Sequence, residues 1–455
     1  MDGDTVGLQA EIDALRAQLA VEREAHRQAD KTLARTEAAL AHFVPRQFLE
    51  LLGKEHLADL SLGDAVERKL TILFLDIRGF TPMCEGLTPS DTFRFVNAFL
   101  GELEPEIERH RGFVDKYIGD AIMALFPGGA ADAIAGAQAM LEALDRFNAA
   151  RARAGLSPVR IGIGLNTGTA IVGTVGGSGR METTVLSDAV NLAARLEELS
   201  KRYGVPLLIS EATVYALGQL PGPTVRFLDR IRVKGKTQPQ SVYEVFGCDA
   251  PKLRAAKEAT RARFEEAVAW YHLREIDRAR PLLEACLAEA PDDEPARVYL
   301  ERCRAYQIDG RHEGTGELSG TVAWRDEFTL GYEPIDAQHH ELLAAFNRLA
   351  PGLVAGDTDG VREVFAFLER YVDKHFGLEE RLMARHAYPL MAEHVREHRS
   401  FVEHFERLRR QVESGRHEHP FLVFLVQIFL IDWFANHSTG TDRHLARHLR
   451  RIGVG

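Results

Sequence analysis

Histidines and carboxylates near the C-terminal end of the chain have the spacing of metal ligands. His375 and Glu379 lie four residues apart, and so do His394 and His398. Residues four apart in a helix project from the same face and can share one metal ion. These two pairs therefore indicate a metal site between predicted helices.

A third pair, His437 and Asp442, is five residues apart, which is about 140° around an ideal helix. Both can face one metal only if that helix is locally deformed, and Ser-Thr-Gly-Thr at 438–441 permits this. His339 adds an imidazole from an earlier helix. Five imidazoles and two carboxylates suit a pair of non-haem iron ions in a helical bundle. The candidate ligands are His339, His375, Glu379, His394, His398, His437 and Asp442.

Two acidic residues in the first half of the chain indicate a second site. Asp76 follows an apolar run at 71–75, and Asp120 lies in a tight turn between two other predicted strands. Carboxylates at neighbouring strand ends can hold two divalent cations over a triphosphate. Just after Asp76, a turn into a helix would offer backbone N–H groups to phosphate oxygens. The residues of this turn are Gly79, Phe80 and Thr81.

The elements that must position this second site alternate between strands and helices. Apolar and β-branched runs predict strands at 69–75, 113–117, 121–126, 159–165, 170–175, 226–233 and 241–246. Helices are expected at 132–153 and 187–203. Interleaved strands and helices predict a sheet domain of the α+β or α/β class over residues 45–248.

The flanking regions are predicted to be helical. Residues 1–44 carry apolar positions in alternating steps of four and three, which favours a coiled coil over a single amphipathic helix lying on a domain. Residues 249–320 resemble one tetratricopeptide-type helix pair followed by a linker, and we interpret them as a spacer. Residues 321–455 contain helical stretches at 336–350, 359–384, 388–413 and 420–450, which predict a four-helix bundle. The seam positions of the coiled coil are Leu8, Ile12, Leu15, Leu19, Glu22, His26, Ala29, Leu33, Thr36, Leu40 and Phe43.

Composition limits the function classes. The net charge of −11 argues against a nucleic-acid partner. The four cysteines are scattered, which indicates neither a disulfide framework nor a zinc knuckle and fits a reducing cytoplasm. No signal peptide is apparent, and the most apolar stretch, 421–434, is too short and polar for a membrane span. We therefore expect a soluble, cytoplasmic protein.

Four segments resemble the class III nucleotidyl cyclases: FLDIRGFT (74–81), DKYIGDAIMALF (115–126), TTVLSDAVNLAARLE (183–197) and IRVKGK (231–236). The resemblance implies a ferredoxin-like core that works as a homodimer, with active sites shared across the interface. It also implies that ATP is cyclised to 3′,5′-cyclic AMP with release of pyrophosphate.

The resemblance assigns roles to individual residues of the cyclase segments. Asp76 and Asp120 match the aspartates that hold two Mg²⁺ or Mn²⁺ ions. Asn191 matches the residue that positions the ribose, and Arg195 the one that stabilises the transition state. Lys234 matches a triphosphate-contacting lysine, although neighbouring Lys236 is an alternative.

Lys116 and Thr184 match the pair that reads the purine. Lysine can donate to an adenine ring nitrogen, and threonine can accept from the exocyclic amine. Guanylate cyclases typically carry Glu with Cys or another small residue at these positions, so the pair favours ATP over GTP. The Lys–Thr combination resembles class IIIb, many of whose members respond to bicarbonate.

The C-terminal segments resemble the bacteriohemerythrins: GYEPIDAQHHELL (331–343), HFGLEERLM (375–383), YPLMAEHVREHRSF (388–401) and DWFANHSTGTD (432–442). All seven ligand positions of that family are filled. The resemblance implies that His394, His398 and His437 bind one iron, that His339 and His375 bind the other, and that the two carboxylates bridge them. It further implies an open position for dioxygen on the iron with fewer histidines.

Joining the two halves predicts an adenylate cyclase regulated by dioxygen, nitric oxide or redox state. Three alternatives stay open. The enzyme could use GTP, it could be constitutive with the bundle serving only as an oxygen or iron binding module, or the catalytic half could be a degenerate scaffold. The complete set Asp76, Lys116, Asp120, Asn191 and Arg195 argues against the last. The sequence leaves open the direction of regulation, bicarbonate sensitivity, the downstream target and the placement of the domains.

Overall fold

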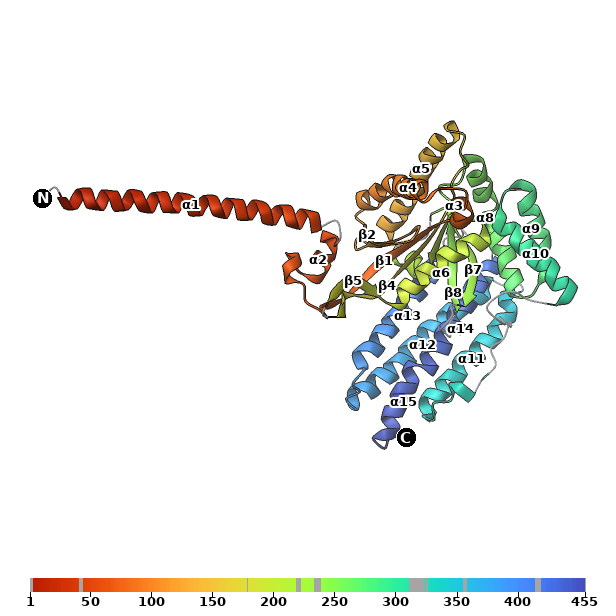
Figure 1. The fold of residues 1–455 in the computed structure, drawn as a ribbon. Helices are drawn as coiled ribbons and strands as arrows, with labels where there is room; N and C mark the ends of the chain where they lie inside the picture. Colours follow the sequence, from red (N-terminus) through yellow and green to blue (C-terminus); the bar gives the residue numbers. More distant parts are fainter. Residues whose placement is uncertain are drawn as a thin grey trace.

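A computed structural model gives the arrangement of the chain (Figure 1). It describes residues 3–40, 44–177, 179–217, 222–232, 239–310, 324, 326–354, 358–413 and 419–454. A long N-terminal helix projects away from the rest of the molecule, and the remaining elements form a sheet domain, a group of three helices and a helical bundle.

Helix α1 (Gly3–Leu40) runs for 38 residues without touching the sheet domain along its length (Figure 1). Its apolar residues Leu15, Leu19 and Leu33 are exposed to solvent. The alternative of a helix lying on a domain is therefore wrong. A helix with an exposed heptad seam is the form in which a coiled-coil strand appears when its partner is absent.

The central strand of the sheet is β1 (Ala65–Ile77). It pairs antiparallel with β3 (Ala121–Phe126) and β4 (Ile161–Gly177), and β2 (Phe113–Ile118) lies outside β3. Helices α4 (Pro89–Arg109) and α5 (Ala130–Arg153) pack on each other, and α5 covers β1, β3 and β4. The strand order β2-β3-β1-β4 with two helical crossovers is the ferredoxin-like arrangement, so the predicted fold class is confirmed.

The sheet continues on the other side of β4. Strand β6 (Leu207–Ser210) pairs parallel with β4, followed by β8 (Pro239–Val245) and β7 (Val225–Arg232). Strand β5 (Arg180–Leu186) forms a hairpin with the outer half of β4. The short helices of this domain are α2 (Arg46–Leu52), which precedes β1, α3 (Phe80–Cys84), which follows β1, and α7 (Glu211–Ala216), which follows β6.

The expectation of separate strands at 159–165 and 170–175 is wrong, because β4 is continuous. Three of its glycines, Gly162, Gly164 and Gly168, face helix α6 (Asp188–Tyr203). A Cβ on Gly164 would lie 2.3 Å from the backbone nitrogen of Glu197, and one on Gly168 would lie 2.8 Å from Cβ of Ala189. Glycine is needed here because the backbone of α6 approaches the strand closely.

Helices α8 (Pro251–His272), α9 (Ile276–Glu289) and α10 (Glu294–Asp309) form the predicted helical spacer. They do not stand free, since α8 packs on β7 and α10 packs on α6. One buried core cluster contains side chains from the sheet, the spacer and the bundle, including Phe227, Phe264 and Phe424. The spacer is therefore an integral layer between the other two parts.

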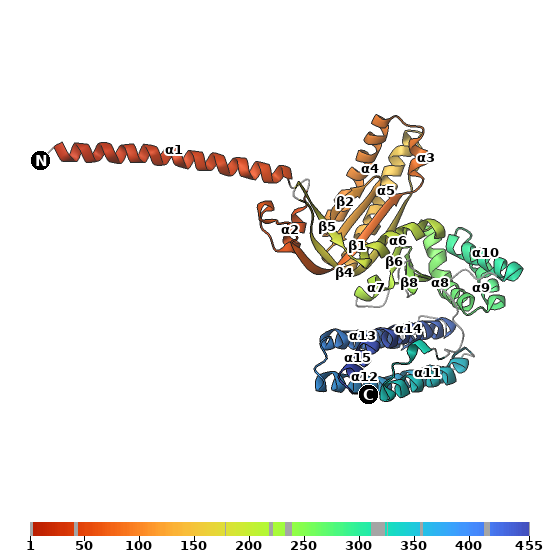
Figure 2. The same ribbon diagram turned by 60° about the horizontal axis from the view of Figure 1, so that its bottom comes forward.

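The bundle consists of α11 (Glu333–Val354), α12 (Thr358–Arg385), α13 (Met391–Glu413) and α14 (His419–Thr439), with α15 (Thr441–Arg451) continuing after a break. Helices α13 and α14 lie on the side nearest the sheet domain, with α11 and α12 behind them (Figure 2). Within the described residues, no helix combines the length and apolar character needed to cross a bilayer.

Buried ion pairs hold the spacer to the sheet. The Arg226 guanidinium, on β7, bonds both carboxylate oxygens of Asp293 at 2.6 and 2.8 Å and one oxygen of Glu244 at 2.6 Å. The Lys257 ammonium, on α8, bonds the other oxygen of Glu244 at 2.6 Å. Arg226, Glu244 and Asp293 are fully shielded from solvent. Because each charge is paired, the helices cannot move away from β7 without exposing or orphaning a charge.

We expect Asp293→Ala to lower the free energy of unfolding by about 3–5 kcal/mol, because it leaves the Arg226 charge buried with one partner fewer. Urea denaturation followed by circular dichroism measures this. The control is Glu289→Ala, which removes an exposed pair with Arg263 and should cost at most about 1 kcal/mol. Equal costs for the two variants would contradict the role given to the buried network.

Candidate active site and candidate metal centre

The two predicted metal-binding aspartates lie side by side at one end of the sheet. Asp76 is the penultimate residue of β1, and Asp120 lies in the β2–β3 turn, where Gly119 has a φ of 66°. Burial raises the pKa of Asp120 to about 6, and the negative charge of Asp76 adds to this. Two carboxylates that destabilise each other's charge favour a cation between them.

A positively charged side chain of α6, Lys201, already contacts one of these two aspartates. The Lys201 ammonium lies 2.6 Å from Oδ2 of Asp76 and 3.4 Å from Oε1 of Glu197. Burial raises the pKa of Glu197 to about 7, against the effect of Lys201. The sequence reasoning missed both Lys201 and Glu197. The available signal was their four-residue spacing on the helix that carries Asn191 and Arg195.

The predicted purine-reading pair is brought together across two strands. The Lys116 ammonium, on β2, donates to Oγ1 of Thr184, on β5, at 3.2 Å. The β2–β3 register shifts between Val114 and Lys116, which makes Asp115 a bulge residue. Bulges re-aim neighbouring side chains, and this one accompanies the turn of Lys116 toward Thr184.

Asp115 is a polar residue of this site that the sequence reasoning missed. Its carboxylate is 1% exposed and lies 3.4 Å from the Lys116 ammonium. Neither of its oxygens accepts a hydrogen bond from the described residues. Burial raises the pKa of Asp115, although the Lys116 charge opposes this. A buried acid beside a bulge gives no distinct signal in sequence, because acids in turns are common.

Asn191 and Arg195 lie on the exposed side of α6. The Arg195 guanidinium pairs with the carboxylate of Glu198 on the same helix. A rise of 1.5 Å per residue places Asn191 about 15 Å along the helix from Lys201, which touches Asp76. Within one chain, therefore, Asn191 does not converge with the two aspartates.

The remaining predicted residues of the nucleotide site divide into two groups. Gly79, with a φ of 68°, is the N-cap of α3 and follows β1 directly, so the expected turn into a helix is present. The Phe80 ring stacks on Phe95 with centroids 6.4 Å apart, which leaves its backbone for ligand contact. Lys234 and Lys236 lie outside the described residues.

The seven predicted iron ligands converge at the centre of the bundle. All are at most 2% exposed, and they come from all four helices and from α15. Four of them, Glu379, His394, His398 and His437, bring one ligand atom each within 4.8 Å of the others, and so do His375, Glu379, His437 and Asp442. The two groups share Glu379 and His437, so the arrangement has room for two adjacent ions.

The two carboxylates lie between the imidazoles. Oε2 of Glu379 is 3.1 Å from Nε2 of His398, 3.2 Å from that of His394 and 3.9 Å from that of His375. The Asp442 carboxylate lies 2.9 Å from Nε2 of His437 and 3.2 Å from Nε2 of His339. Each carboxylate thus faces histidines from different helices, the geometry expected of a bridging ligand.

The expected deformation between His437 and Asp442 is present. Helix α14 ends at Thr439, and α15 begins at Thr441. Gly440 between them has φ −100° and ψ −90°, which interrupts the helical path. In a continuous helix, His437 and Asp442 would point in directions about 140° apart. The break removes this constraint. It lets both side chains enter the same buried space.

Three polar neighbours orient the histidines, and the sequence reasoning missed them. Nδ1 of His375 lies 2.9 Å from Oε1 of Gln338, Nδ1 of His398 lies 3.1 Å from Oε1 of Glu380, and Nδ1 of His437 lies 3.4 Å from Oε2 of Glu397. An ionised Glu380 carboxylate can only accept, so it favours the tautomer of His398 with the proton on Nδ1, in which Nε2 can bind a metal. Each of the three is adjacent in sequence to a candidate ligand. This adjacency was the signal in the sequence that could have identified them.

The charges at the centre of the bundle call for a cation. Burial alone would raise the pKa of Glu379, but the charge of His375 and hydrogen bonds from three histidines hold this pKa well below its usual range. Burial lowers the pKa of His375 to about 4. Oε1 of Glu379, Nε2 of His375 and both oxygens of Asp442 have no hydrogen-bond partner among the described residues. Orphaned buried ligand atoms with imidazole and carboxylate chemistry fit an iron pair.

Comparisons with known proteins identify a family for each of the two regions that contain these sites. Residues 65–246 match the family described as adenylate and guanylate cyclase catalytic domain, and residues 330–449 match the hemerythrin HHE cation binding domain. An adenylate cyclase of Anabaena cylindrica is 42% identical over 219 residues, which is 47% of this chain and 44% of that protein. A terminal-differentiation specific adenylate cyclase of Dictyostelium discoideum is 36% identical over 273 residues, which is 59% of this chain and 13% of that protein.

The crystal structure of the guanylyl cyclase Cya2 is 32% identical in sequence, with a TM-score of 0.36, over 41% of this chain and 96% of that one. This chain spans less than half the length of the two curated relatives named above. The two family matches nevertheless cover the two sites separately and in full. Residues 65–246 therefore belong to the adenylate and guanylate cyclase catalytic domains, and residues 330–449 to the hemerythrin HHE domains.

Proposed function

We propose that this protein is an adenylate cyclase that converts ATP to 3′,5′-cyclic AMP and pyrophosphate. The observation that carries the proposal is the Lys116–Thr184 hydrogen bond of 3.2 Å. Lysine offers further donors for an adenine ring nitrogen, and the threonine oxygen retains a lone pair for the exocyclic amine. Guanine presents the opposite pattern at this edge.

The cyclisation needs positive charge around the phosphates. The ribose 3′-oxygen attacks the α-phosphorus in line, the bond to the β-phosphate oxygen breaks, and pyrophosphate leaves. Asp76 and Asp120 would hold two Mg²⁺ or Mn²⁺ ions, which would neutralise charge on the phosphate oxygens when bound. Asn191 would orient the ribose, and Arg195 would stabilise the charge that builds in the transition state.

The protein works as a homodimer in this proposal. Asn191 lies about 15 Å along α6 from Lys201, and Lys201 contacts Asp76, so a complete site requires residues from a second copy. Exposed apolar side chains gather on β2 and the β4–β5 hairpin, next to the purine-reading pair: Tyr117, Ile118, Ile171, Val175, Met181 and Leu186. The exposed seam of α1 gives a second surface for the same pairing.

We further propose that the bundle holds two iron ions and that their state sets the rate of the cyclase. An iron pair at this site would supply binding of dioxygen or nitric oxide, or a change of redox state. The contribution of the chain is the buried ligand cage and the direct contact between the bundle and the sheet domain. The rings of Phe424 and Phe227, one from each side, lie 5.4 Å apart.

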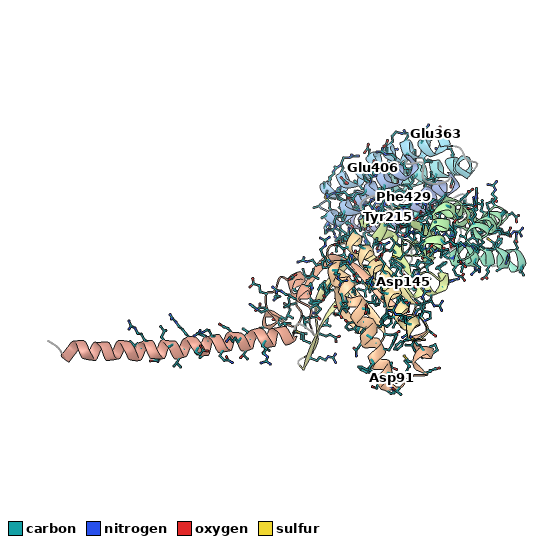
Figure 3. The ribbon with its side chains drawn as sticks, turned by 90° about the horizontal axis from the view of Figure 1, so that it is seen from above. Asp91, Asp145, Tyr215, Glu363, Glu406 and Phe429 are labelled. Atoms are coloured by element: carbon teal, nitrogen blue, oxygen red, sulfur yellow. The ribbon has the colours of Figure 1, made fainter. Side chains whose placement is uncertain are left out.

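Asp76→Ala should lower cyclic AMP formation by a factor on the order of 10²–10³ or more, because one ligand of the catalytic metals is lost. The dimer should persist, because the apolar surface is unchanged. A coupled pyrophosphate assay and analytical ultracentrifugation measure the two properties. Asp145→Ala, on the exposed side of α5 (Figure 3), is the control and should keep wild-type turnover. Wild-type turnover in the Asp76 variant would refute the assignment.

The combined variant Lys116→Glu, Thr184→Cys should lower kcat/KM for ATP by roughly tenfold or more, because adenine then faces groups that cannot pair with it. Competing reactions with ATP and GTP measure the change in preference. Thr183→Cys places the same substitution on the opposite face of β5 and should leave the preference as it is. Unchanged ATP kinetics in the combined variant would argue against this purine pocket.

The purified chain should carry about two irons and absorb visible light through charge-transfer bands after exposure to air. Cyclic AMP formation should differ between anaerobic, reduced protein and air-exposed protein of the same preparation. Glu379→Gln should lose iron, whereas His444→Ala, an exposed histidine near Asp442, should retain it. Normal iron content with equal rates in both states would leave the bundle as a binding module and exclude regulation.

A further inference from the structure

Helix α6 is the element on which the proposed catalytic residues depend. It carries Asn191 and Arg195 in its first half and Lys201, which bonds Asp76, in its last turn. A helix of 16 residues is rigid over its length of about 24 Å. The helix packs on β4 along its length, and the contacts at its C-terminal end also help to set the position of these side chains.

A buried polar network holds this end. Tyr203, the last residue of α6, donates its hydroxyl hydrogen bond to Oδ2 of Asp229 on β7. Arg302 of α10 bonds the same Asp229 oxygen at 3.0 Å and the Tyr203 hydroxyl at 2.9 Å. Nε2 of His272, at the end of α8, lies 3.0 Å from Oδ1 of Asp229. One aspartate thus joins α6 to α8 and α10 of the spacer.

The network is charged and dry. Tyr203, Asp229, His272 and Arg302 are each at most 6% exposed. Burial would raise the pKa of Asp229, but hydrogen bonding from His272 and the charge of Arg302 outweigh it and hold this pKa well below its usual range. A buried hydrogen bond to an ionised group is among the stronger ones in proteins. The end of α6 is therefore held by strong, directional bonds.

The backbone after α6 confirms that the end is held closely. Gly204 caps the helix with a φ of 66°. A Cβ at this position would lie 2.6 Å from Cγ of Glu294, in the first turn of α10. The spacer thus contacts α6 through side chains and through the backbone.

Helix α14, which carries the candidate iron ligand His437, packs against the other side of the same network. The Phe424 ring stacks on the His272 imidazole, with centroids 5.4 Å apart and an interplanar angle of 20°. Phe424 lies 13 residues, or about 20 Å, before the candidate iron ligand His437 on the same helix. The Trp433 ring stacks on His437 at 4.5 Å.

The bundle contacts the sheet domain less tightly next to α7. A cavity of about 150 Å³ lies between Trp433 and Phe429 of α14, His404 of α13 and Tyr215 of α7. Phe429 and Tyr215 lie near each other where the bundle meets the sheet domain (Figure 3). The interface therefore has a close contact at Phe424 and free volume beside Trp433, which gives α14 room to shift about the Phe424 contact.

We propose that Tyr203, held by Asp229, is a positioning residue for Asn191 and Arg195, and that the Phe424–His272 stack makes α14 part of the same support. The second half of this inference rests on the proposed regulation by the iron pair. If α14 moves near His437, Phe424 displaces the His272 ring, and His272 in turn displaces Asp229. Because Asp229 holds Tyr203, the displacement is passed to α6 and to the active-site residues on it. A displacement near 1 Å is enough to change a rate by up to about a hundredfold.

The first test uses full-length, iron-loaded protein and Tyr203→Phe. Loss of the hydroxyl should lower kcat by roughly tenfold with an unchanged KM for ATP, because α6 is loosened while the Lys116–Thr184 pair is intact. The control is Tyr215→Phe, which removes a phenol hydroxyl outside the Asp229 network that donates to the Glu211 carboxylate at 2.7 Å. Equal losses of kcat in both variants, or a wild-type kcat in Tyr203→Phe, would overturn the positioning role.

The second test compares reduced, anaerobic protein with air-exposed protein for Phe424→Leu. The ratio of the two rates should fall close to one, with iron content and visible spectrum unchanged. Phe429→Leu is the matched control, because this ring is on the same helix but packs on Phe401 at 4.9 Å. It should keep the wild-type ratio.

The outcomes separate the two proposals. A wild-type protein with equal rates in both iron states contradicts the proposed regulation and the role of Phe424, while Tyr203→Phe still decides the positioning role. A wild-type response that survives Phe424→Leu overturns the proposed route alone. Loss of the response in Phe429→Leu but not in Phe424→Leu would place the route at α7 instead.

Discussion

A charge can be buried in a protein only where an opposite charge, a hydrogen bond or a metal lies beside it. This constraint acts at three places in the chain. Arg226 on β7 is matched by Asp293 and Glu244, and Asp229 is matched by Arg302 and His272. At the centre of the bundle the carboxylates of Glu379 and Asp442 face only histidines, which leaves ligand atoms without partners. In the first two networks each charge has an opposite charge beside it, and the ligand atoms of the third fit cations.

The first two networks determine how the parts are joined. The spacer would be free to swing if it met the sheet only through apolar contacts, because those are not directional. Its ion pairs fix α8 and α10 to β7 and to the end of α6. The bundle then packs on this assembly through the aromatic side chains of α14. The iron cage and the nucleotide site are consequently parts of one continuous packed structure.

The two candidate sites differ in their exposure to solvent, as their proposed chemistry requires. The bundle buries every candidate iron ligand to 2% exposure or less. This burial would shield two bound iron ions from bulk water. The nucleotide site is open, with Asn191 and Arg195 exposed on α6. An open half-site bordered by exposed apolar residues fits an enzyme that forms its active site with a second copy. The closed site is then suited to sensing and the open site to turnover.

The sequence by itself determined the parts whose signals are local. The i,i+4 pairs of ligands, the heptad of α1, the hairpin around Gly119 and the break after His437 follow from helix and turn geometry over a few residues. It did not determine the contacts between residues far apart in the chain. The sequence predicted two strands in place of the continuous β4, because only the fold shows that α6 lies against Gly164 and Gly168. Asp115 and the Asp229 network gave no signal, since an ordinary charged residue acquires its role from the neighbours that folding supplies. Pairing across such distances depends on tertiary packing, and the placement of the iron bundle against α8 and β7 was decided there alone.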